Sequence, residues 1–193
     1  MRLATQHPDW VLGFADETWW SRFAHPALHS WTEGEPLRLV EQVPPKRDPE
    51  PKALCCYGLL RTDADEVLLR FVDGRPVSHV TTAFLQWLGE RLVAERKTVL
   101  VLIWDNASWH ISQEVRNWKR AHNQRVKQHG GIRLLTCRLP VKSPWLNPLE
   151  PHWVHGKRAI VEPARLLTAA EVIARVYDYF EAEHCELLKQ KVA

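Results

Sequence analysis

At 193 residues the chain fits a single domain with a substantial buried core. Hydrophobic residues make up 45% and charged residues 25% of the sequence, which excludes a disordered chain. The net charge of +3 is uneven, because residues 106–165 contain eleven Lys or Arg against three Asp or Glu. Such a basic segment indicates a face that meets a polyanion, although cations that only keep a helix surface soluble would give the same count.

Cysteine usage and apolar segments indicate the cellular compartment. The four cysteines show no C-x-x-C spacing, and the adjacent pair Cys55 and Cys56 is a poor disulfide candidate. The N-terminal segment MRLATQHPDW lacks the basic start and apolar run of a signal peptide, and no stretch reaches about 18 apolar residues. We therefore expect a reduced, cytoplasmic protein without membrane association.

The first half of the chain is predicted to contain strands. Residues 10–15 form an apolar run that stops at Asp16, and a second run follows a polar break. After a Pro-rich polar loop at 43–52, two β-rich segments flank the turn-forming residues 62–65, which predicts an antiparallel hairpin. The predicted strands of this half are 10–15, 19–23, 52–61 and 66–74.

The second half alternates between helices and strands. Residues 99–104 (VLVLIW) are apolar without alternation, which is typical of a strand buried on both faces, and this run stops at Asp105. Helices are predicted by apolar periodicity and by capping residues. The remaining predicted elements are a strand at 132–139 and helices at 81–97, 112–128, 148–158 and 168–188.

This order of elements predicts the fold class. Early strands, a hairpin among them, followed by helix, strand, helix, strand and helix are typical of the ribonuclease H-like fold. We therefore predict an α/β protein with a mixed sheet of about five strands flanked by helices. A single domain would cover residues 1–193, with its core at about 10–160 and a C-terminal helix at about 168–188.

Two aspartates are candidates for a metal site. Asp16 and Asp105 each directly follow an apolar strand, and strand ends are where an α/β sheet usually places its site. Neighbouring carboxylates repel each other, and a bound divalent cation removes that cost. Oxygen ligands suit Mg²⁺ or Mn²⁺. Each aspartate also fits an ordinary turn or helix cap, which is the alternative for both.

A third carboxylate lies in the segment SPWLNPLEPHW. Asn147 can cap a helix, Pro148 fits its first position, and Glu150 falls in its first turn. This placement holds a carboxylate rigidly and keeps it ionised beside the positive end of the helix. Asn147 and Glu150 could also form a capping box, and the two roles can coexist.

Three sequence blocks resemble one known family. The blocks are FADE around Asp16, IWDNASWH around Asp105 and LPVKSPWLNPLEPHW around Glu150. They resemble the mariner-related bacterial insertion-sequence transposases, also called DDE superfamily endonucleases, over about residues 10–158. The last two blocks rarely occur together by chance.

The resemblance implies an activity, a cofactor and a substrate. Asp16, Asp105 and Glu150 would hold two Mg²⁺ or Mn²⁺ ions about 3.5–4 Å apart. One ion would activate water or a DNA 3′-hydroxyl, and the other would stabilise the leaving oxygen in an in-line displacement at phosphorus. The catalytic domain would cut the terminal inverted repeats of an insertion sequence and join them to target DNA at TA dinucleotides.

Four further residues are candidates for supporting or DNA-binding roles. Asn106 and His110 match the family pattern, and His110 could orient a phosphate or water, or be a capping or surface histidine. Lys157 shares a helical face with Glu150, and Lys157 or Arg158 could contact a DNA phosphate. A solvated charge is the alternative for both cations.

One feature departs from the family. Relatives carry helix-turn-helix units before the catalytic domain, whereas here the first strand is predicted near Trp10, so we expect that DNA-binding domain to be absent. The expected partners are DNA, a separate DNA-binding reading-frame product and a second copy in a homodimer. The alternatives to an active transposase domain are a domesticated or inactive remnant that acts as a DNA-binding or interaction module, and a ribonuclease H-like or resolvase-type nuclease.

Overall fold

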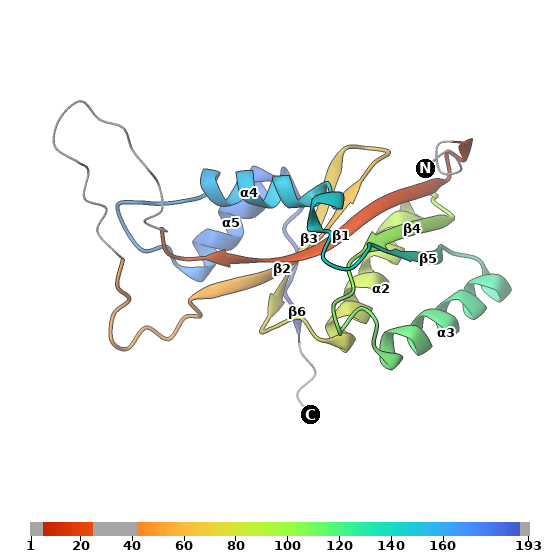
Figure 1. The fold of residues 1–193 in the computed structure, drawn as a ribbon, viewed down its shortest axis with the longest axis horizontal. Coiled ribbons are helices and arrows are strands. Elements are labelled where there is room, and N and C mark those ends of the chain that lie inside the picture. Colours follow the sequence, from red (N-terminus) through yellow and green to blue (C-terminus); the bar gives the residue numbers. More distant parts are fainter. Residues whose placement is uncertain (1–5, 25–41, 190–193) are drawn as a thin grey trace.

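Six strands form one mixed sheet in the computed structural model, which describes residues 6–24 and 42–189 (Figure 1). Their order across the sheet is β5-β4-β1-β2-β3-β6. β1 and β3 pair antiparallel with β2, whereas β4 runs parallel to β1, and β5 runs parallel to β4. The predicted mixed α/β sheet is therefore confirmed, with one short strand more than expected. The strands are β1 (Trp10–Ser21), β2 (Ala53–Arg61), β3 (Glu66–Asp73), β4 (Val99–Trp104), β5 (Arg133–Arg138) and β6 (Leu188–Lys189).

Helices cover both faces of the sheet (Figure 1). Side chains alternate between the two faces along each strand, so that Cys55 packs with one pair of helices and Cys56 with the other. In the described ranges, no helix is long and apolar enough to span a bilayer. One face carries α2 (Ser78–Ala94) and α3 (Gln113–His129), and the other carries α4 (Leu149–Ala159) and α5 (Ala169–Tyr179).

Two predicted elements differ in the structure. β1 is a single strand of 12 residues, because the polar residues of the predicted break pair with β2: Asp16 lies opposite Gly58. Asp16 is therefore inside a strand, and its predicted place after a strand end is wrong. The last helix ends at Tyr179, nine residues earlier than predicted, where Glu181 adopts a left-handed backbone (φ +50°). Residues 188–189 instead form β6 beside β3.

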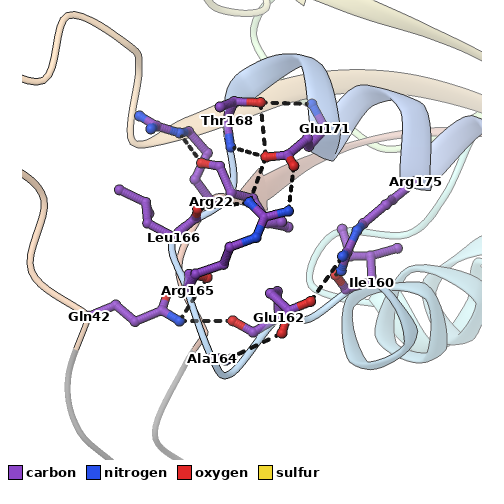
Figure 2. A network of polar contacts seen from close by, with 11 residues as sticks. Arg22, Gln42, Ile160, Glu162, Ala164, Arg165, Leu166, Thr168, Glu171 and Arg175 are labelled. Carbon is purple, nitrogen blue, oxygen red and sulfur yellow. Dashed lines mark hydrogen bonds and ion pairs between the residues drawn. The ribbon is translucent and has the colours of Figure 1, made fainter.

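Polar contacts fix the connection between α4 and α5 to the end of β1 (Figure 2). The buried Arg22, which follows β1, donates through Nε to a carbonyl oxygen of this connection at 2.7 Å. The side-chain amide of Gln42 donates to the carbonyl oxygens of Glu162 and Arg165 at 2.8 and 3.1 Å. Arg165 also pairs with Glu171 in the first turn of α5 (2.9 Å). Both helices of this face are thereby tied to β1.

Gly58 of β2 provides the surface on which α4 packs. A Cβ atom at this position would lie 2.4 Å from Cη2 of Trp153 and 2.6 Å from its Cζ2. The indole of Trp153 is fully buried against this backbone and meets Trp20 edge to face, with ring centroids 5.9 Å apart. Glycine is required here because any side chain would occupy the space of the indole ring.

We predict that Gly58→Ala lowers the free energy of unfolding by about 1–3 kcal/mol, since the new methyl group must displace Trp153. Urea denaturation measures this change. Gly89→Ala in α2 is the matched control, because its Cβ would approach only Ile132, at 3.3 Å, and alanine favours a helix. Wild-type stability in Gly58→Ala would contradict the close approach of Trp153 to β2.

Candidate active site

Parallel pairing of β1 with β4 brings the two aspartates to the same edge of the sheet. The last described pair of this ladder is Phe14 with Ile103, so continuing the register by two residues sets Asp16 beside Asp105. Both side chains line a cavity of about 210 Å³ together with Glu150 and Asn106. The predicted convergence of the three carboxylates on one cavity is thus seen in the structure.

Asp16 points toward α4 and is the less exposed of the two aspartates. Its Oδ2 accepts a hydrogen bond from the indole Nε1 of Trp153 at 3.1 Å. Burial, together with the neighbouring carboxylates of Glu17 and Glu150, raises the pKa of Asp16 to about 7. The cavity therefore has an excess of negative charge, which a cation would relieve.

Asp105 is more exposed than Asp16, and its pKa is shifted in the opposite direction. It follows β4 with an exposed side chain, and its Oδ1 accepts hydrogen bonds from the His110 imidazole at 2.7 Å and from the Ala107 amide at 2.9 Å. These bonds lower the pKa of Asp105 below its usual value. The cavity thus combines one carboxylate that stays ionised with one that is partly protonated near neutral pH.

Glu150 enters the cavity from the first turn of α4. The buried Asn147 fixes this turn, because its Oδ1 accepts from the Leu149 amide at 3.1 Å and its Nδ2 donates to the Ala15 carbonyl at 3.3 Å. Asn147 therefore joins the start of α4 to β1. In α4 the alternative Asn147–Glu150 capping box is not formed.

His110 is buried between two carboxylates and is not a surface residue. Its Nε2 lies 2.6 Å from Oε1 of Glu17, and its Nδ1 bonds Asp105. Burial opposes protonation of the imidazole, but the two carboxylates outweigh it and raise the pKa of His110 to about 9. The ring is therefore an imidazolium at neutral pH, with both N–H groups donating to carboxylates.

Glu17 has a place in this site that the sequence alone did not reveal. It follows Asp16 directly, and in a strand such neighbours face opposite sides of the sheet. Its partner His110 lies 93 residues away. No local pattern predicts such a contact, although a glutamate on the buried face of a strand is itself a signal that a cation must lie near.

The other predicted residues differ in their relation to the cavity, because Asn106 lines it whereas Lys157 and Arg158 do not. Asn106 lines it and donates through Nδ2 to the Leu139 carbonyl at 2.7 Å, which links the ends of β4 and β5. Lys157 lies on the same face of α4 as Glu150. Desolvation lowers the pKa of Lys157, while Glu150 and Asp16 act against that change. Arg158 is exposed and does not line the cavity.

The donor chemistry of the cavity fits a hard divalent cation. Three carboxylates supply oxygen ligands of the kind that Mg²⁺ and Mn²⁺ prefer, and burial together with the charges of Glu17 and Glu150 raises the pKa of Asp16. Among the residues that the structure describes, no three acidic, histidine or cysteine side chains are close enough to hold an ion as they stand. Coordination of one ion by all three carboxylates would therefore require them to draw together.

The sequence matches the profile of a family described as DDE superfamily endonuclease over residues 14–173. This span covers most of the chain, and the chain belongs to that family. No curated protein matches the sequence.

Solved structures share the fold at low sequence identity. The Mos1 transposase paired-end complex with left transposon end matches with a TM-score of 0.64 and 17% identity, over 90% of this chain and 48% of that one. The catalytic domain of Mos1 mariner transposase matches with a TM-score of 0.56 and 16% identity, over 90% and 71%. The predicted ribonuclease H-like fold is therefore confirmed. The chain spans about half the length of the Mos1 chains in such complexes.

We predict that Trp153→Phe raises the pKa of Asp16 further above 7, by about half a unit to one unit, because the indole N–H stabilises the ionised carboxylate. Carbon-detected NMR of the aspartate side chains measures this titration. Trp20→Phe is the control, since it alters the same aromatic cluster without touching the carboxylate. Equal shifts in both variants would mean that packing, not the hydrogen bond, sets the pKa.

Proposed function

We propose that the chain is a transposase catalytic domain, which cuts the terminal inverted repeats of an insertion sequence and joins them to target DNA at TA dinucleotides. The observation that carries this proposal is that Asp16, Asp105 and Glu150 line one cavity in a chain of the DDE endonuclease family. Asp16 lies on β1, Asp105 follows β4 and Glu150 lies on α4, so three separate elements position the three carboxylates. DNA phosphodiesters are the substrate class that such a site serves.

Mg²⁺ or Mn²⁺ would supply, when bound, an activated water or 3′-hydroxyl and charge stabilisation of the leaving oxygen. Related structures support this choice, since Mos1 mariner paired-end complexes are described with Mn and with Mg. Asp105 is held ionised for this task by His110 and the Ala107 amide. Asp16 must release its proton before it can act as a ligand, whereas Glu150 is presented by a fixed helix turn.

Cations beside the site support DNA as its substrate. A second cavity of about 350 Å³ lies between α3 and β5, and Trp104 and His110 form part of its wall. Arg116, Lys119 and Arg138 line it, no acidic residue does, and none of the three pairs with a carboxylate in the described ranges. Three uncompensated cations next to three carboxylates fit a DNA backbone that passes from one cavity to the other.

Other partners follow from the same proposal. Mos1 transposase is described in paired-end complexes with transposon ends, which supports a homodimer of this chain on two DNA ends. A separate DNA-binding product would supply recognition of the inverted repeats. We propose the cytoplasm as the place of both associations.

Asp105→Asn and Glu150→Gln are each predicted to abolish Mg²⁺- or Mn²⁺-dependent cleavage of DNA. The loss should exceed the 10- to 100-fold effect typical of outer-shell residues, because a ligand itself is removed. Cleavage of end-labelled duplex and single-stranded DNA measures activity, and thermal unfolding should change little. Asp178→Asn, on the exposed surface of α5, is the control. Retained cleavage in either site variant would refute the proposed function.

Lys157→Ala and Arg116→Ala are predicted to weaken DNA binding and to lower the salt dependence of the binding constant by about one unit of log–log slope each, because each removes one phosphate contact. Fluorescence anisotropy at several salt concentrations, in Ca²⁺ to prevent cleavage, provides the measurement. Lys46→Ala in the Pro-rich loop is the matched control on an exposed cation. An unchanged slope in Lys157→Ala or Arg116→Ala would exclude the substituted residue from the DNA interface.

A further inference from the structure

His110 connects the Glu17 carboxylate on β1 with the Asp105 carboxylate, which directly follows β4. Its imidazole bonds Oδ1 of Asp105 at 2.7 Å and Oε1 of Glu17 at 2.6 Å. The side chains of His110 and Glu17 are 1% and 7% exposed, whereas that of Asp105 is 53% exposed. The three groups therefore form a hydrogen-bonded chain that begins in the protein interior and ends at the cavity.

The imidazole ring has no freedom to turn away from this arrangement. It stacks on Trp104, the last residue of β4, with ring centroids 4.4 Å apart and planes 9° from parallel, and Trp109 meets it edge to face. The backbone N–H of His110 also bonds the Ala107 carbonyl at 2.9 Å. The direction of its N–H groups is thus set by packing, and Asp105 must adapt to it.

Glu17 anchors the inner end of the chain. Asp16 reaches Trp153 on the α4 face of β1, whereas Glu17 reaches His110 on the opposite face. Burial and the Glu17 carboxylate raise the pKa of Tyr57 on the neighbouring strand, so Glu17 lies near this phenol as well as near His110. Asp16 thus lines the cavity directly, whereas Glu17 is linked to it through the His110 imidazole and Asp105.

We propose that Glu17 and His110 are positioning residues that orient Asp105 for cation binding. The imidazole and the Ala107 amide both bond Oδ1, which leaves Oδ2 as the oxygen that would bind the ion. A hydrogen-bonded outer shell of this kind fixes ligand orientation and raises affinity. The inference rests on the proposed function, because it presupposes that Asp105 is a ligand.

The test is Mn²⁺ binding by the full chain, measured by electron paramagnetic resonance of the free ion. His110→Ala should weaken Mn²⁺ binding about 10- to 100-fold. His110→Asn should recover part of this loss, because its amide can donate to Asp105 from nearly the position of Nδ1. The Mn²⁺ concentration for half-maximal DNA cleavage should shift in the same order.

Glu17→Gln replaces His110→Ala in the test if His110→Ala does not fold. This substitution keeps the size of the Glu17 side chain and removes its charge. It should weaken Mn²⁺ binding less than His110→Ala but measurably. His122→Ala is the matched control, because His122 also stacks on a tryptophan, Trp118, and bonds a backbone carbonyl, yet lies far along α3 from the cavity. It should leave Mn²⁺ affinity unchanged.

The outcomes separate this inference from the proposed function. Wild-type Mn²⁺ affinity in folded His110→Ala or Glu17→Gln would overturn the positioning role alone. An equal loss of affinity in His122→Ala would also overturn it, since the effect would then reflect general stability. A wild-type chain that neither binds Mn²⁺ nor cleaves DNA would overturn the proposed function and this inference together.

Discussion

The parallel ladder between β1 and β4 determines where the site can form. It runs in register from Trp10 with Val99 to Phe14 with Ile103, and then β4 ends while β1 continues along β2. At Asp16, β1 is therefore paired with β2 but no longer with β4. The place that β4 leaves beside β1 is filled by the segment after β4 and by the start of α4, and each brings a carboxylate. A difference in length between two neighbouring strands thus creates the cavity.

The two faces of β1 bring different support to this cavity. On one face, Gly58 lets Trp153 approach the sheet closely enough to donate to Asp16, and α4 presents Glu150. On the other face, Glu17 holds His110 against Asp105. Because side chains alternate along a strand, one short polar stretch of β1 reaches α4 on one face and the segment after β4 on the other. The site therefore borders both hydrophobic cores through Trp153 and Trp104.

Much of this arrangement could be predicted from the sequence, because the relevant signals are local. The apolar run of β4 ends where predicted, and the hairpin and α3 lie within a residue or two of their predicted bounds. Asp16 was misplaced because Asp-Glu-Thr has the composition of a turn, whereas its backbone is satisfied by the distant β2. The contact between Glu17 and His110 depends on packing across the sheet, which periodicity does not encode.

The position of Trp153 on α4 also restricts how the chain length can vary. Glu150 and Trp153 lie three residues apart, so both reach the cavity from one side of the helix. Each inserted residue rotates the remainder of the helix by about 100°, so an insertion between them would turn one of the two side chains away. The geometry of α4 therefore excludes insertions between Glu150 and Trp153.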